Sequence, residues 1–193
     1  RTLETAQKPD KEVENQKLAP LIPVDEELKS LFIQSKKFAY ANKPEDAIKT
    51  FEKALERADK IGDTETKSKI FYEVGKIYDN QSFFAEALNS YNQSIKNTKD
   101  NNVKTKAHYS MAQIYDDVNQ IQPALDHYFN SISFAGEADN LAAQSTSLTK
   151  MGNIFTDLFD YDAMTYFATA NELASQTDNS KVKGFVSSST ADA

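Results

Sequence analysis

Residues 71–95 read FYEVGKIYDNQSFFAEALNSYNQSI, and residues 108–132 read HYSMAQIYDDVNQIQPALDHYFNSI. The second stretch repeats the first at an offset of 37 residues, the distance from Phe71 to His108. The equivalent pairs are Phe71 and His108, Val74 and Met111, Gly75 and Ala112, Tyr78 and Tyr115, Ala87 and Ala124, Tyr91 and Tyr128, Ser94 and Ser131, and Ile95 and Ile132. Self-similarity with a period of about 20 to 50 residues is typical of solenoids, in which each repeat buries its apolar face against its neighbours. The pattern therefore predicts a protein built from stacked repeats.

The same pattern continues in both directions along the chain. Forty residues upstream, Phe38, Ala47 and Phe51 take the places of Tyr78, Ala87 and Tyr91. Downstream, Leu148, Met151 and Gly152 begin a fourth copy, whose second helix fits at Ala163, Phe167 and Ala170 if the turn is one residue shorter. Phe185 is expected to occupy the opening position of a fifth copy, equivalent to Phe71. The predicted repeats cover about 24–62, 64–100, 102–138 and 139–178, with a partial repeat over 179–193.

Apolar residues recur at helical spacing within each repeat, as at Ile70, Val74 and Ile77. We expect helix pairs over 25–41 and 44–60, 64–80 and 83–98, 102–118 and 121–136, and 139–158 and 160–176. Pro44 is expected in the first turn of a helix, where no backbone donor is needed. Gly62 and Gly136 follow second helices, so both are expected to be left-handed caps.

The repeated pattern resembles the tetratricopeptide repeat (TPR) family, in its longer-repeat form of 37 to 40 residues. The resemblance covers residues 28–176. It implies an all-α fold, a right-handed α-solenoid of antiparallel helix pairs with about four repeats and a truncated first helix of a fifth. The family has Gly at the small-residue position on the first helix, where this chain has Ser35 and Ala112 in the first and third repeats. Both are small enough to let the paired helices approach closely.

The opening stretch has a different character from the repeats. Residues 1–23 contain Pro9, Pro20 and Pro23, with interspersed charges and little apolar periodicity, so we expect an extended or disordered linker arm. The chain starts at Arg1 rather than at Met, which suggests a piece of a longer polypeptide without its native N-terminus. The compartment is left open, with a slight preference for the cytoplasm.

Residues that could carry chemistry are few. The chain has no Cys and only five Gly, and it lacks the Gly-rich, His-Glu-x-x-His and Gly-x-Ser-x-Gly motifs of common catalytic sites. His108 lies at a core position of the repeat, and His127 is expected to have a solvated or capping role. The sequence therefore predicts no enzyme activity, no cofactor and no metal site.

The resemblance implies that the first helices line a concave face that binds a ligand. Its ligand-facing positions are Lys29, Phe32, Lys36 and Ala39 in the first repeat, Lys69, Tyr72, Lys76 and Asp79 in the second, Lys106, Tyr109, Gln113 and Asp116 in the third, and Thr146, Thr149, Asn153 and Thr156 in the fourth. Five lysines thus alternate with three aromatic residues, although the molecule has a net charge of -7. An exposed face of solvated lysines is the simpler interpretation.

The acidic balance of the chain argues against nucleic acid, whose binding depends on neutralising phosphates. No apolar run approaches the 18 residues that a membrane span requires, and we expect no direct membrane contact in this fragment. A basic, aromatic concave face favours an extended peptide with acidic residues or a free C-terminal carboxylate. The leading hypothesis is therefore a non-enzymatic protein–protein interaction scaffold. A structural or self-association module, and a regulatory domain of a larger multidomain protein, are the alternatives.

Overall fold

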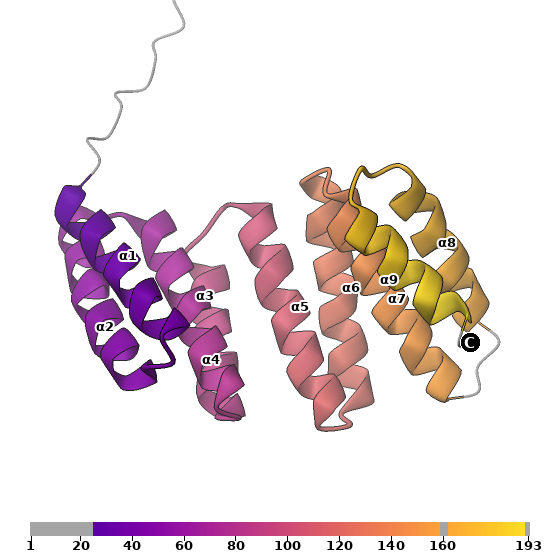
Figure 1. The fold of residues 1–193 in the computed structure, drawn as a ribbon, viewed down its shortest axis with the longest axis horizontal. Helices are drawn as coiled ribbons and strands as arrows, with labels where there is room; N and C mark the ends of the chain where they lie inside the picture. The colour runs from indigo at the N-terminus through magenta and orange to yellow at the C-terminus, as the bar shows by residue number, and fades with distance from the viewer. Residues whose placement is uncertain (1–24, 159–161, 192–193) are drawn as a thin grey trace, which may run out of the picture.

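In a computed structural model of the chain, residues 25–158 and 162–191 are described, and every element in these ranges is an α-helix (Figure 1). The helices are α1 (Glu26–Tyr40), α2 (Pro44–Ile61), α3 (Thr64–Asn80), α4 (Phe84–Lys96), α5 (Asn101–Asp117), α6 (Ile121–Glu137), α7 (Leu141–Asp157), α8 (Ala163–Ser175) and α9 (Ser180–Ala191). The arm predicted for residues 1–23 lies outside the described residues. The predicted helices agree with these bounds closely, and the largest difference is at α8, which begins at Ala163 rather than at residue 160.

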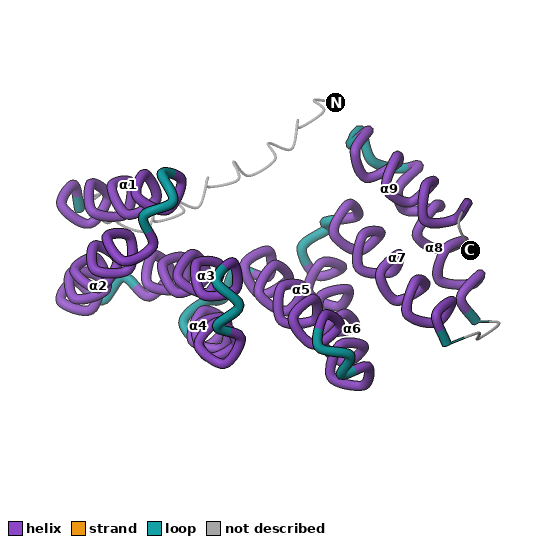
Figure 2. Tube along the Cα trace, turned by 60° about the horizontal axis from the view of Figure 1, so that its bottom comes forward, coloured by secondary structure: helices purple, strands orange, loops and turns teal. Residues whose placement is uncertain are grey.

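Consecutive helices pack as four antiparallel pairs, α1 with α2, α3 with α4, α5 with α6 and α7 with α8. The pairs stack side by side, and α9 packs against both α7 and α8. Figure 2 shows the first helices of the pairs, together with α9, along the inner side of a curved array, with the second helices on the outer side. The fold is an all-helical solenoid of repeated helix pairs, as the sequence predicts.

The core of each repeat is centred on one aromatic residue of its second helix. Phe51, Tyr91, Tyr128 and Phe167 are all completely buried. Each lies four residues after an alanine that is also buried, at Ala47, Ala87, Ala124 and Ala163. This Ala-x-x-x-aromatic unit places both side chains on one face of the helix, because residues four apart are neighbours on a helix surface.

A small residue of the first helix makes room for this aromatic ring. An added Cβ at Gly75 would lie 2.7 Å from the Tyr91 ring, and one at Gly152 would lie 2.8 Å from the Phe167 ring. Both distances are too short for van der Waals contact. Ser35 and Ala112 occupy the same position in the other two repeats and are also completely buried. The predicted requirement for a small residue is confirmed.

The turns differ from the prediction at one glycine. Gly62 has φ of 71° and forms the left-handed cap of α2, as predicted. Gly136 instead lies inside α6, so the prediction of a second glycine cap is wrong. The left-handed residue after α6 is Asp139, with φ of 51°, and Gly136 leaves space for the side chain of Gln144. Asn42, Ser82 and Asn119 have positive φ at the turns within the first three repeats.

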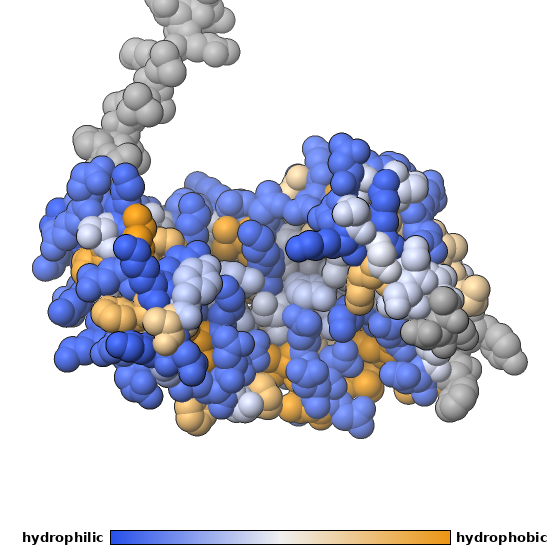
Figure 3. All heavy atoms as spheres, in the orientation of Figure 1, coloured by the Kyte–Doolittle hydropathy of each residue, from blue (hydrophilic) through white to orange (hydrophobic). Residues whose placement is uncertain are grey.

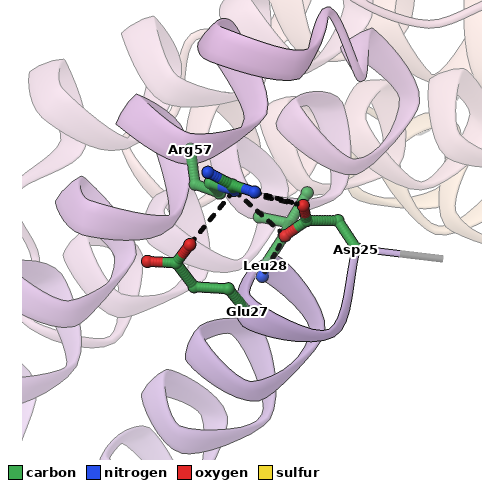
Figure 4. Close-up of polar contacts among 4 residues, drawn as sticks. All are labelled: Asp25, Glu27, Leu28 and Arg57. Atoms are coloured by element: carbon green, nitrogen blue, oxygen red, sulfur yellow. Dashed lines mark hydrogen bonds and ion pairs between the residues drawn. The ribbon is translucent and has the colours of Figure 1, made fainter. Parts of the chain in front are cut away.

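A network of charged groups fixes the start of the described solenoid (Figure 4). Asp25 caps α1 by accepting a hydrogen bond from the backbone N–H of Leu28 at 2.8 Å. Its carboxylate also accepts three hydrogen bonds from the Nε and Nη2 groups of Arg57 in α2, the shortest at 2.6 Å, and Glu27 lies 3.2 Å from the same guanidinium. The Arg57 hydrogen bond holds the pKa of Asp25 below its ordinary value. This planar, two-point contact joins the first turn of α1 to the last turns of α2.

The last helix continues the repeat, two residues out of the predicted register. The N-caps of α3, α5 and α7 are Asp63, Asp100 and Asn140, and Asn179 accepts hydrogen bonds from the first backbone N–H groups of α9. Seven positions after these four residues stand Ile70, Ala107, Ser147 and Val186, all completely buried. Val186 packs with Ala170 and Ala174 of α8. In this register the position of Phe71 falls at Ser187, so the assignment of Phe185 to that position is wrong by two residues.

Candidate functional site

The predicted ligand-facing residues lie on the first helices α1, α3, α5 and α7, and most are exposed or half-buried. Thr149 is the exception, since it is completely buried and its hydroxyl donates to the carbonyl of Ser145. We use the term concave face for the inner side formed by α1, α3, α5, α7 and α9 (Figure 2).

Three hollows bring residues from neighbouring repeats together on this face. The first, of about 590 Å³, includes Lys29, Phe32 and Lys69. The second, of about 170 Å³, includes Lys36, Ala39 and Lys76. The third, of about 280 Å³, spans α3 to α9, and we call it the central hollow. Its lining includes Tyr72, Lys106, Tyr109, Thr146 and Val182.

The three aromatic residues of the concave face rest on the core aromatic residues beneath them. The ring centroids of Phe32 and Phe51 are 5.9 Å apart, those of Tyr72 and Tyr91 are 5.6 Å apart, and those of Tyr109 and Tyr128 are 5.7 Å apart. Such pairs favour tilted or edge-on contacts of this kind. Burial raises the pKa of Tyr109 to about 12, so its hydroxyl is neutral at ordinary pH. The exposed parts of these rings form fixed apolar surfaces, because the core determines their position.

The five lysines are not equivalent. Lys36 of α1 and Lys76 of α3 both contact Glu73, at 3.1 and 3.0 Å. Burial by itself would lower the pKa of Lys36, but the hydrogen bond and attraction to Glu73 outweigh it and raise the pKa. Glu73 therefore partly neutralises the concave face between the first and second repeats. Sequence reasoning missed this residue, although its spacing of three from Lys76 is a recognisable helical pairing signal.

The remaining three lysines are exposed. Lys29 lies 3.6 Å from Glu26, a weak surface pair between neighbouring turns of the helix. Within the described ranges, Lys69 and Lys106 have no ion pair. They are the most available cations among the predicted ligand-facing residues, and they belong to the first and third of the three hollows.

The two predicted acidic residues have a different role from the lysines. Asp79 accepts a hydrogen bond from the hydroxyl of Tyr91 at 3.4 Å, and Asp116 accepts one from Tyr128 at 3.5 Å. Partial burial raises the pKa of both carboxyl groups. In the other repeats the core aromatic is Phe, which has no hydroxyl, and the equivalent first-helix residue is Ala39 or Thr156. The pairing of Asp with Tyr within the sequence could have identified these carboxylates as partners of the core hydroxyls.

Gln113 and Asn153 occupy the position equivalent to Lys36 and Lys76 and are half-buried. Where the structure describes the chain, neither amide has a side-chain hydrogen bond. The basic character of the concave face therefore decreases from the first two repeats toward the fourth.

The two histidines form a contact that the sequence did not predict. The Nδ1 atoms of His108 in α5 and His127 in α6 are 2.9 Å apart. The His127 ring also stacks on Tyr115 at 5.4 Å between centroids, so the prediction of a solvated or capping role is wrong. His108 stacks on Phe134 at 5.5 Å and has the predicted core environment. Burial is the largest cause that lowers the pKa of both rings, and for His108 the value falls to about 4.

Metal-ligating side chains do not gather in the part of the chain that the structure describes. Across residues 25–158 and 162–191, no three His, Cys, Asp or Glu side chains are placed to hold an ion together. Over the same residues, every helix is too short or too polar to cross a membrane.

Neither a family model nor a curated protein sequence matches the chain. Solved structures do match. The chain is similar to the crystal structure of BtubC (BKLC) from P. vanneervenii, with a TM-score of 0.67 and 14% identity over 86% of this chain and 73% of that one. Two crystal structures of MamA have TM-scores of 0.56 and 0.54, with 20% and 19% identity over 79% and 77% of this chain and 81% and 74% of theirs. These are TPR-type helical repeat proteins, so the fold is a TPR-like α-solenoid.

Proposed function

We propose that this chain is a member of the TPR family in its longer-repeat form, and that it is a non-enzymatic scaffold that binds an extended peptide on its concave face. The TPR-like fold supports a role in protein interaction. The peptide-binding proposal rests on one observation, which is the position beside fixed aromatic surfaces of two lysines that have no ion pair within residues 25–158 and 162–191. Lys106 lines the central hollow together with Tyr72 and Tyr109, and Lys69 lies one helical turn from Tyr72 on α3.

This arrangement is complementary to an acidic, partly apolar peptide. Lys69 and Lys106 hold a carboxylate, which is either an acidic side chain or the C-terminus. The central hollow, at about 280 Å³, accepts an apolar side chain of the same peptide between Tyr72 and Tyr109. Lys36 and Lys76 contribute less, because Glu73 already occupies both ammonium groups.

A paired charge reversal tests the proposal. The probes are fluorescent peptides of about ten residues in acidic, neutral and basic series, each with a free carboxylate or an amidated C-terminus. We expect the wild-type protein to prefer acidic peptides, and Lys69→Glu with Lys106→Glu to weaken their binding about tenfold or more, since two attractions become repulsions. Lys49→Glu with Lys53→Glu is the matched control, because it makes the same charge change at exposed positions of the second helix α2.

Two outcomes would overturn the proposal. One is equal affinity of the wild-type protein for acidic and basic peptides. The other is an equal loss of binding in the concave-face and control variants, since this would mean that only net charge matters. The alternative of self-association is tested by light scattering, in which a mass that rises with concentration would favour it and a constant monomer mass would oppose it.

A further inference from the structure

The third repeat contains a pair of facing histidines with no equivalent in the other repeats. In the second repeat, the positions of His108 and His127 are held by Phe71 and Ser90. In the first repeat they are held by Leu31 and Thr50. The common contact between the paired helices is the aromatic pair one residue further along, Tyr109 with Tyr128 in this repeat. The histidine pair is therefore an addition to the standard core of the repeat.

The geometry identifies the contact as a hydrogen bond between two imidazoles. The Nδ1 atoms are 2.9 Å apart and the ring centroids are 5.2 Å apart, so the two nitrogens point toward each other. Such a bond needs one Nδ1 that carries a hydrogen and one that does not. A metal ion about 2.0 Å from both nitrogens would have to lie to one side of the line that joins them, whereas the facing rings direct their Nδ1 lone pairs along that line.

The rings on either side hold the two imidazoles in place. Tyr115 and His127 are stacked with an interplanar angle of 7°, and His108 and Phe134 with one of 13°. Together the four rings form a continuous row across the interface between α5 and α6. The Nζ atom of Lys104 lies 5.0 Å from the centre of the Phe134 ring, at the His108 end of this row.

We propose that His108 and His127 form a pH-sensitive switch, which holds α5 against α6 while the pair carries at most one charge and releases it when both rings are protonated. A first proton on the donor ring keeps the hydrogen bond, because its Nδ1–H still faces the unprotonated Nδ1 of the partner. A second proton places two N–H groups and two positive charges against each other. The hydrogen bond is then replaced by repulsion within a partly buried interface.

Two charged groups act on the pair from the helices that carry it. Lys104 of α5 disfavours a charge on His108, and Asp126 of α6 favours a charge on His127. His127 is therefore the ring that accepts the first proton more readily. The second proton then binds His108, next to the charged His127 ring and to Lys104. It therefore binds at a lower pH than the first, and the pair titrates in two separate steps.

The direction of the pH effect follows from the lowered pKa of both rings. An unfolded chain takes up protons near the ordinary histidine pKa of 6.5, whereas the folded chain takes them up only at lower pH, near 4 for His108. The contribution of the pair to stability is therefore fully present above pH 6.5 and is lost as the pH falls toward 4. The loss is concentrated in α5 and α6, and α5 also carries Lys106 and Tyr109 of the concave face.

Imidazole NMR on the wild-type protein tests the hydrogen bond without any mutation. We expect the ¹⁵N shifts at neutral pH to show one ring with its hydrogen on Nδ1, and two titration steps, with the lower one near pH 4. Two independent titrations near pH 6.5 would overturn the proposal, because they would mean that neither burial nor the partner affects the rings.

A variant that copies the second repeat tests the switch. His108→Phe with His127→Ser places the residues of positions 71 and 90 in the third repeat. Between pH 7 and 4.5, we expect wild-type amides of α5 and α6 to lose about tenfold more protection from hydrogen exchange than those of α3 and α4, and the variant to lose protection evenly. An even loss in the wild-type protein, or the same local loss in the variant, would refute the switch. If the variant does not fold, the comparison of helices within the wild-type protein still decides the question.

Discussion

The second and third repeats have the same core but different polar contacts. In both, a small residue of the first helix faces a buried tyrosine, and an aspartate accepts a hydrogen bond from the tyrosine hydroxyl. The two repeats differ in their other polar contacts. In the second repeat Glu73 forms ion pairs with Lys36 and Lys76. In the third repeat His108 forms a hydrogen bond with His127. The shared contacts build the fold, since every repeat needs them or an apolar equivalent. The contacts that differ are where the repeats acquire individual properties.

The largest expected effect comes from the small-residue position, where the second repeat has Gly75 and the third has Ala112. Gly75→Leu should lower the free energy of unfolding by about 3 kcal/mol or more, because the Tyr91 ring occupies the space that the side chain needs. Gly75→Ala should cost about 1 to 3 kcal/mol for the same reason. Urea unfolding followed by circular dichroism measures both.

The third repeat supplies the control for this position. Ala112→Gly restores the residue type of the second repeat and creates no overlap, so it should cost only about 1 kcal/mol, from the lower helix propensity of glycine. If Gly75→Ala instead stabilised the protein, this would contradict the prediction that a Cβ at position 75 overlaps the Tyr91 ring.

The pairing of aspartate with tyrosine predicts an intermediate effect. Tyr91→Phe should lower the free energy of unfolding by about 1 kcal/mol, because the half-buried carboxylate of Asp79 loses the hydroxyl that donates a hydrogen bond to it. Adding Asp79→Thr copies the Thr156 and Phe167 pair of the fourth repeat and should recover most of the loss. A double-mutant cycle measures this coupling. Strictly additive effects of the two substitutions would show that the hydrogen bond contributes nothing.

The smallest effect is expected at the turn within the second repeat. Ser82 has φ of 61°, which is unfavourable for a residue with a Cβ, and the third repeat has Asn119, a better left-handed residue, at the same place. Ser82→Gly should therefore stabilise the protein by about 0.5 to 1 kcal/mol, seen as a higher Tm in calorimetry. Asn89→Gly, at an exposed position inside α4, has no such strain to relieve and should not stabilise. Equal effects of the two substitutions would argue against strain at Ser82.

The sequence was sufficient for the architecture because the core positions repeat with a fixed spacing. Ala87, Tyr91 and Gly75 could be assigned from the repeat alone, and all are buried as expected. The prediction failed where repetition gave no information. The sequence predicts a cap at Gly136 because glycine often ends a helix, but the side chain of Gln144 occupies the space that this glycine leaves. Val186 was missed because the N-cap at Asn179, and not the aromatic at Phe185, sets the register of α9.

The candidate site was predictable in position but not in chemistry. The sequence located the lysines and aromatic residues of the concave face on the first helices, where the structure also places them. It treated all five lysines as equal, since the ion pair from Lys36 to Glu73 joins residues of different repeats. The sequence also predicts that Asp79 and Asp116 face a ligand, although their carboxylates accept hydrogen bonds from the core hydroxyls of Tyr91 and Tyr128.

By itself, the amino-acid sequence determined that this protein is a solenoid of helix pairs, because burial of one face per helix imposes a spacing that can be read along the chain. Only the tertiary structure decided which polar groups pair where the pair occurs in a single place and is not repeated. Such pairing depends on distances between side chains on different helices, as between His108 and His127, and no spacing along one helix encodes those distances.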